Sequence, residues 1–184
     1  RAEWRLHRGT AVIEMARASG LELVGGAENN DALAATTTGT GELIDEALDR
    51  GARKIVVCLG GSATTDGGLG CVRAITSPPR LKRVELLVAC DVETRFVDAA
   101  AVFAPQKGAS PDEISALDMG LRSWAAVLAR ATGRDVAALP GSGAAGGAAA
   151  ALLAACNATM APGAELIADL IGLDEALAGA DLVL

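Results

Sequence analysis

A glycine- and hydroxyl-rich loop, GGSATTDGG at positions 60–68, holds the residues best suited to chemistry. Gly60, Gly61 and Gly67 can take backbone angles closed to other residues, which lets consecutive N–H groups converge on one anionic oxygen. Further hydrogen-bond donors in the loop are the hydroxyls of Ser62, Thr64 and Thr65. The composition of this loop therefore indicates a pocket for a small anion.

Asp66 supplies the carboxylate of this loop, a group that can hold a metal ion or accept a proton. No lysine follows the glycines, so the loop is not a phosphate-binding Walker loop, and it does not fit the GxGxxG dinucleotide pattern either. The strand-like run KIVVCL at 54–59 leads directly into it. Glycine loops after buried strands often hold ligands, which favours a binding loop over a glycine-rich turn with polar filler.

A second carboxylate, Asp91, follows the apolar run VELLVAC at 84–90. Ligands of open α/β sheets gather beyond the carboxyl ends of the strands, so Asp66 and Asp91 should face one crevice if the two strands are parallel. The alternative for Asp91 is an ordinary polar cap at the end of a strand.

Two more positions suit anion binding. Lys107 precedes a strongly capped helix and is either a mobile point charge for an anionic substrate or a solvated loop lysine. Gly143 belongs to a second glycine loop, GSGAAGG at 141–147, which opens onto an alanine-rich segment. Free N–H groups at that helix start could seat an oxyanion or a phosphate, whereas the steric alternative is close packing of two backbones.

Composition limits the classes of partner. The chain has 184 residues, of which 51% are hydrophobic and 21% charged, enough to bury a core as one domain. A net charge of -7 argues against binding to nucleic acid or to an anionic membrane surface. Aromatic residues make up 2% and tyrosine is absent, so base-stacking surfaces are not expected.

The cysteines and the single histidine point to a reduced, cytoplasmic protein without a metal cluster. No CxxC spacing occurs, and we expect four reduced thiols, mostly in the core, at Cys58, Cys71, Cys90 and Cys156. His7 lies in a charged stretch and suits a surface position. The segment 143–156 is too short and too rich in Gly and Ala to cross a membrane, and it predicts a closely packed helix.

Strand-like runs alternate with helical patterns, which predicts an α/β fold with a mixed, mainly parallel sheet flanked by helices. Ser110, Pro111 and Glu113 form a capping-box pattern that starts a helix ending near Gly133. Thr40 is predicted as the N-cap of an earlier helix. Further predictions are short helices at 69–74, 165–171 and 174–177 and a beginning strand at 181–184.

Taken together, several motifs in order resemble the bacterial glycerate kinase family, which phosphorylates glycerate with ATP. The resemblance covers most of the chain, and members are roughly twice as long, so positions 1–184 resemble an inner portion, one α/β domain of a two-domain kinase. The family usually has Asn where this chain has Thr65. The matching strings are TAVIEMARASGL, TTTGTGELIDEALDRGARKIVVCLGGSATTDGG, VACDV, VFAPQKGA and GSGAAGG, with the segment from Pro162 onward.

The resemblance implies that glycerate and ATP meet in a cleft between two domains, with Mg²⁺ carried by the nucleotide and this chain supplying one wall. It leaves open which glycerate hydroxyl is phosphorylated and whether subunits form a homo-oligomer. Residues that match family motifs are Gly60, Gly61, Ser62, Thr64, Asp66, Asp91, Gln106 and Lys107.

Roles for these residues follow as hypotheses. The loop at 60–68 grips the glycerate carboxylate or the transferring phosphate, and Lys107 offsets negative charge. Asp66 is the first candidate to orient or deprotonate the attacking hydroxyl, or to hold Mg²⁺, and Asp91 is the second. The alternative is a non-catalytic domain that binds a small acid or another anion, or that serves only as structure.

Overall fold

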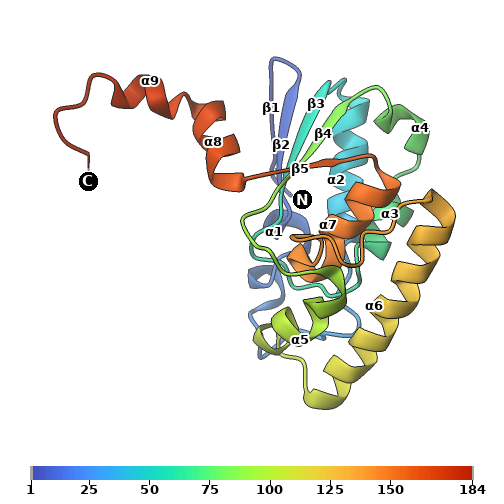
Figure 1. Ribbon diagram of the computed structural model, residues 1–184. Helices are drawn as coiled ribbons and strands as arrows, with labels where there is room; N and C mark the ends of the chain where they lie inside the picture. The colour runs from blue at the N-terminus through green and yellow to red at the C-terminus, as the bar shows by residue number, and fades with distance from the viewer. Residues whose placement is uncertain (1, 184) are drawn as a thin grey trace.

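A five-stranded sheet forms the centre of the molecule in a computed structural model, which describes residues 2–183 (Figure 1). The strands lie side by side in chain order; β1 is antiparallel to β2, and the other neighbouring pairs are parallel. This confirms the predicted mixed, mainly parallel sheet. The strands are β1 (Arg5–His7), β2 (Thr10–Glu14), β3 (Lys54–Cys58), β4 (Glu85–Ala89) and β5 (Thr159–Ala161).

The central strands are apolar because both of their faces are covered. Ile55, Val56 and Val57 of β3 are fully buried although they point alternately to opposite faces. Val57 pairs in register with Val88 of β4. The β-branched side chains at these positions favour the extended backbone.

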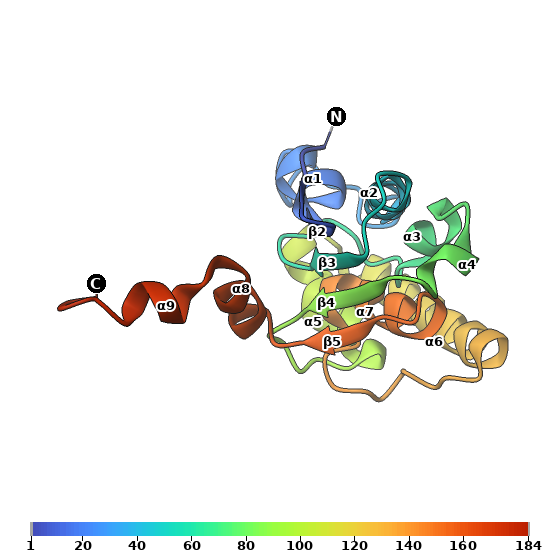
Figure 2. The ribbon, with the colours of Figure 1, turned by 90° about the horizontal axis from the view of Figure 1, so that it is seen from above.

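Helices occupy the connections between parallel strands. From β2 to β5, each connection moves one strand further across the sheet in the same sense. Right-handed crossovers of this kind place the connecting helices on one face of the sheet. Figure 2 shows α2, α3, α6 and α7 on that side. The connecting helices are α1 (Ala16–Ser19), α2 (Thr38–Asp49), α3 (Leu69–Ala74), α4 (Pro78–Leu81), α5 (Ala99–Phe103), α6 (Pro111–Thr132) and α7 (Ala144–Ala155), with short 3-10 turns η1 (Glu22–Val24), η2 (Phe96–Asp98) and η3 (Pro105–Lys107).

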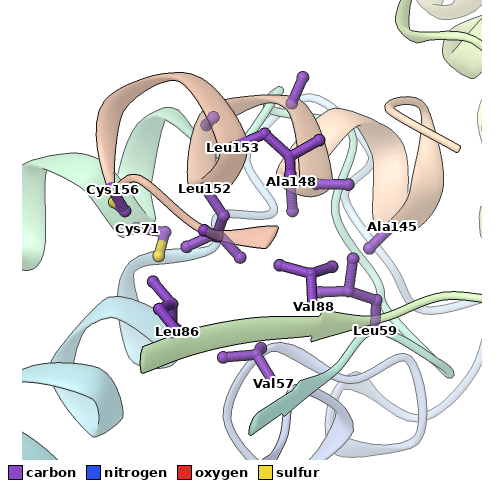
Figure 3. Close-up of a cluster of buried hydrophobic side chains, with 14 of the residues drawn as sticks. Val57, Leu59, Cys71, Leu86, Val88, Ala145, Ala148, Leu152, Leu153 and Cys156 are labelled. Atoms are coloured by element: carbon purple, nitrogen blue, oxygen red, sulfur yellow. The ribbon is translucent and has the colours of Figure 1, made fainter. Parts of the chain in front are cut away.

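The main core lies between the sheet and α7. Ala148 and Leu152 of α7 face Leu86 and Val88 of β4 in Figure 3, and all four side chains are buried. Ten of the twelve residues of α7 are glycine or alanine. Such small side chains let the helix backbone approach its neighbours closely, which confirms the predicted packed helix at 143–156.

The opposite face of the sheet carries a smaller apolar cluster of Val56, Leu87 and Ala89. Leu166 of α8 (Gly163–Ile171) packs on this cluster, and α9 (Leu173–Leu177) continues from α8 away from the sheet (Figures 1 and 2). Both short helices predicted near the end of the sequence are therefore confirmed.

The four cysteines are free thiols, as expected. Cys71 and Cys156 are buried, and burial raises the pKa of both, that of Cys156 to about 12. Cys58 and Cys90 are half-buried at the ends of β3 and β4. His7 is exposed on β1, which confirms its surface position. Among the described residues no helix is long and apolar enough to cross a membrane.

The capping box at the start of α6 is confirmed, since Ser110 and Glu113 bond reciprocally and Gly133 closes the helix at φ +71°. Two other local predictions are wrong. Helix α2 begins at Thr38, with Thr37 rather than Thr40 as N-cap, because the Thr37 hydroxyl is engaged by Asp66. Residues 181–183 form no strand, since α8 and α9 carry them away from the sheet (Figure 1), and Leu184 lies outside the described residues.

Candidate active site

A cleft of about 480 Å³ opens at the carboxyl edge of the parallel sheet. The loops that follow β3 and β4 form two of its walls, and the turn before α6 and the start of α7 complete it. Ligands of open α/β sheets bind at this edge. The cleft is lined by Leu21, Leu59, Gly60, Gly61, Ser62, Ala89, Cys90, Asp91, Val92, Phe103, Gln106, Lys107, Ala144 and Ala145.

Lys107 lies in this cleft with only 3% of its surface exposed. Its Nζ donates to Ser62 Oγ at 2.9 Å and to the carbonyl oxygen of Thr64. In residues 2–183 no carboxylate oxygen lies within 4.0 Å of this nitrogen. The expectation of a mobile or solvated loop lysine is therefore wrong, because the side chain is buried and held by two acceptors.

Burial lowers the pKa of Lys107 to about 8, and the negative charge of Asp66 opposes part of that shift. The amine is therefore mostly protonated at neutral pH. A buried charge without an ionic partner is costly, and an anionic ligand in the cleft would supply that partner.

Asn30 fixes the backbone around Lys107. Its Nδ2 donates to the carbonyl oxygens of Ala63, at 3.0 Å, and Lys107, at 2.8 Å, so one side chain joins the glycine loop to the turn before α6. Gly108 follows at φ +90°, where an added Cβ would lie 2.1 Å from the Ala27 carbonyl oxygen. Sequence reasoning missed Asn30, because an asparagine in a polar loop gives no signal of its distant partners.

The first half of the glycine loop faces the cleft with unused donors. Gly60, Gly61 and Ser62 line the cleft, and within the described part of the chain their N–H groups have no protein acceptor. The loop is anchored beside these amides, since Leu21 donates to the Gly61 carbonyl and Ala63 donates to that of Ser19. Ser62 Oγ accepts from Lys107, which leaves its own hydroxyl hydrogen free for a ligand.

Asp91 lines the cleft and also anchors α8. Its Oδ1 accepts from the amides of Gly163, at 2.7 Å, and Ala164, at 3.3 Å, whereas Oδ2 has no hydrogen bond with the described residues. Asp91 therefore lines the cleft and holds the start of α8 with one side chain. Gln106, on the same turn as Lys107, is exposed and lines the cleft as well.

Other predicted site residues lie beside the cleft and do not line it. Thr64 and Thr65 are buried, and the Thr64 hydroxyl has no partner within residues 2–183. Gly67 donates to the Gly146 carbonyl and accepts from Trp124 Nε1. The Gly143 amide donates to the Thr94 carbonyl oxygen, which favours its steric role.

Asp66 is likewise absent from the cleft lining. Both oxygens of its carboxylate accept hydrogen bonds from neighbouring main-chain and hydroxyl groups, and none of these donors lines the cleft. The structure thus brings Asp91 to the crevice without Asp66. The donors are Thr36 Oγ1, Thr37 N, Thr37 Oγ1, Gly68 N and Gly70 N.

The second glycine loop packs directly against the first. Ala145, Gly146 and Gly147 all have positive φ angles, so α7 starts with a left-handed turn. An added Cβ on Gly146 would lie 2.1 Å from the Thr64 carbonyl oxygen, so only glycine permits this approach. Ala145 is the non-glycine member of the turn, and it lines the cleft.

The fold and the cleft define an α/β domain with a cleft at the carboxyl edge of its sheet, and the comparisons identify its family. The sequence profile of the Glycerate kinase family matches residues 1–78 and 75–184, and the chain belongs to this family. It is 41% identical to Glycerate 2-kinase of Escherichia coli (strain K12), over 95% of this chain and 54% of that protein. It is 38% identical to Glycerate kinase of Halalkalibacterium halodurans, over 96% and 54% of the two chains.

A solved structure agrees with this family assignment. The crystal structure of a candidate glycerate kinase 2 from Salmonella typhimurium LT2 is 40% identical and superposes with a TM-score of 0.86, covering 99% of this chain and 57% of that one. The chain thus spans about half the length of the relatives that it matches.

Proposed function

We propose that this chain forms the acid-binding wall of an active site that phosphorylates glycerate to phosphoglycerate with ATP. The observation that carries the proposal is the buried ammonium of Lys107, which has no carboxylate within 4.0 Å in the described part of the chain and lies beside three amides without acceptors. Such a site stabilises a compact negative charge. The names of the family and of its relatives supply the substrate and the reaction.

The amides of Gly60, Gly61 and Ser62 would bind the carboxylate of glycerate or a phosphate oxygen. Lys107 would add a fixed positive charge and the Ser62 hydroxyl a further donor. Phosphoryl transfer requires mainly alignment of the reacting groups and stabilisation of charge, and rigid donors of this kind provide both.

Asp91 is the carboxylate best placed to orient or deprotonate the attacking hydroxyl, because it lines the cleft and its Oδ2 has no hydrogen-bond donor. Gln106 offers an amide to the same space. Both residues also fit the nucleotide and its metal, since Mg²⁺ in kinase sites is held by one or two carboxylates together with the phosphates. Magnesium supplied with ATP would neutralise phosphate charge.

Calorimetric titration of this chain with D-glycerate, glycerol and Mg-ATP tests the proposal. Glycerol has the hydroxyls of glycerate without its carboxylate, so D-glycerate should bind and glycerol should not. An ADP-release assay with the longest natural polypeptide that contains this chain should show turnover of D-glycerate. Equal binding of glycerol, or no binding of D-glycerate, would contradict the acid site. Binding without turnover in that polypeptide would favour a non-catalytic acid-binding domain.

We also propose a cytoplasmic location for the protein, because free thiols are typical of a reducing compartment.

A further inference from the structure

The carboxylate of Asp66 lies behind the glycine loop and outside the cleft, where it joins three segments of the chain. We propose that Asp66 is a positioning residue, which fixes the glycine loop against the threonine segment 36–38 and so holds Lys107 and the free amides in place. The identity of the ligand in this inference rests on the proposed function, whereas the positioning contacts themselves do not.

The hydrogen bonds of Asp66 tie its carboxylate to the protein. Oδ2 accepts from Thr37 N at 2.9 Å, Thr37 Oγ1 at 2.8 Å, Gly70 N at 3.1 Å and Thr36 Oγ1 at 3.3 Å. Oδ1 accepts from Gly68 N at 3.0 Å. An ionised carboxylate offers about four lone-pair sites. Four of the five donors converge on Oδ2 and the fifth reaches Oδ1, so protein groups occupy most of these sites. In contrast, Oδ2 of Asp91 has no donor among the described residues.

The donors belong to the starts of two helices. Gly68 and Gly70 lie at the first turn of α3, and Thr37 is the N-cap of α2. The Thr37 hydroxyl donates to Asp66 and accepts from the amide of Cys71 at 2.8 Å, so it links both helices through one side chain. A negative charge beside helix N-termini is favourable. Asp66 and Thr37 thus lock α2, α3 and the end of the glycine loop together.

The locked end of the loop connects to the cleft through main-chain contacts. Gly67 donates to the Gly146 carbonyl at 3.0 Å, and Gly146 lies directly against the carbonyl of Thr64. That same Thr64 carbonyl accepts from the ammonium of Lys107. Displacing Asp66 would therefore disturb the acceptor that holds Lys107, although Asp66 does not line the cleft.

The test compares Asp66→Asn with two substitutions at its partner Thr37. Thr37→Val removes the linking hydroxyl, and Thr37→Ser retains it. Thr76→Val is the matched control, because the Thr76 hydroxyl also donates to an aspartate, Asp45, at 2.6 Å but away from the cleft. The readouts are D-glycerate affinity by calorimetry and amide exchange of residues 66–70.

If Asp66 positions the loop, Asp66→Asn and Thr37→Val should each weaken D-glycerate binding about 10-fold, the scale of a lost hydrogen bond to a charged group. Thr37→Ser should restore affinity to within about twofold, and Thr76→Val should not change it. The double variant Thr37→Val with Asp66→Asn should bind D-glycerate with an affinity within about twofold of the weaker-binding single variant, because both substitutions remove the same link. As a third readout, the half-saturating Mg²⁺ concentration for phosphoryl transfer by the longest natural polypeptide that contains this chain should stay unchanged in Asp66→Asn.

Two results would overturn the inference. One is wild-type affinity in Thr37→Val together with a loss of about 100-fold or more in Asp66→Asn, which would mean direct contact with the ligand. The other is a raised Mg²⁺ requirement in Asp66→Asn, which would make Asp66 a metal ligand.

If Asp66→Asn does not fold, the pair Thr37→Val and Thr37→Ser carries the test alone. If the wild-type chain does not bind D-glycerate, the proposed function fails, but amide exchange still tests the positioning role of Asp66. Faster exchange of Gly68 and Gly70 in Thr37→Val but not in Thr37→Ser supports that role. Unchanged exchange in Thr37→Val refutes it.

Discussion

The ammonium of Lys107 donates to the hydroxyl of Ser62 at 2.9 Å, across 45 positions of the sequence. This contact joins the turn before α6 to the loop after β3, so the cation and the free amides form one unit in the cleft. A lysine ammonium has three N–H donors, and the protein uses two of them. The third remains available to a ligand.

Replacing this lysine should weaken the acid site. Lys107→Met keeps most of the length of the side chain and removes the charge, so D-glycerate binding should weaken by at least about 10-fold, as expected for a lost charged hydrogen bond. Calorimetric titration measures the change. Lys82→Met, at an exposed lysine that does not line the cleft, is the control and should bind normally. Equal affinities of the two variants would remove Lys107 from the site.

Acid binding should decline as the pH rises through about 8, the pKa to which burial lowers Lys107. D-Glycerate stays an anion over this range, so the loss reports deprotonation of the protein. Titrations from pH 6.5 to about 9.5 should show affinity falling about 10-fold per unit well above pH 8. A bound ligand shifts this midpoint upward, because it stabilises the ammonium. A flat profile would argue against a role for the ammonium.

Stability should change in the opposite direction. Below pH 8 the lysine is protonated in both the folded and the unfolded chain, and the cost of its burial is fully present. Between about 8 and 10.5 the unfolded chain binds the proton and the folded chain does not, so the free energy of unfolding rises with pH. Urea unfolding at about pH 7 and 9.5 should show a gain on the order of 2 kcal/mol relative to Lys107→Met. A constant difference between the two proteins would contradict the shifted pKa.

The two roles of Asp91 should separate between two substitutions. Asp91→Asn retains an oxygen for the amides of Gly163 and Ala164, so its stability should stay within about 0.5 kcal/mol of wild type. Phosphoryl transfer by the longest natural polypeptide that contains this chain should nevertheless fall on the order of 100-fold. Asp91→Ala should lose about 1 kcal/mol of stability as well, because the first turn of α8 loses its acceptor. Full turnover in Asp91→Asn would exclude its carboxylate from the chemistry.

The close approach of the two glycine loops should make Gly146 intolerant of a side chain. Gly146→Ala combines φ +65° with a Cβ placed 2.1 Å from the Thr64 carbonyl oxygen. It should therefore lower the free energy of unfolding by about 3 kcal/mol or more. Gly133→Ala has a similar φ of +71° with no atom within 4 Å, and it should cost about 1 kcal/mol. Thermal or urea unfolding measures both. Equal losses would mean that strain alone, without the contact, explains Gly146.

Much of the fold could be predicted because its signals are local. The run at 54–59, the capping box at Ser110 and the small-residue helix from Gly143 each depend on residues near one another in the chain. Where a distant partner intervened, local signals failed. Thr40 carried the pattern of an N-cap, yet the helix starts earlier because Asp66 engages the Thr37 hydroxyl.

The residue types that could bind an anion, and the position of two cleft loops directly after strands, could be read from composition and local pattern. Which of these residues share the cleft depends on the folded arrangement. It turned Asp66 toward α2 and α3, left Asp91 at the opening and buried Lys107 beside Ser62. The physical reason is that a polar side chain is directed by the partners that satisfy its hydrogen bonds, and here those partners lie tens of residues away.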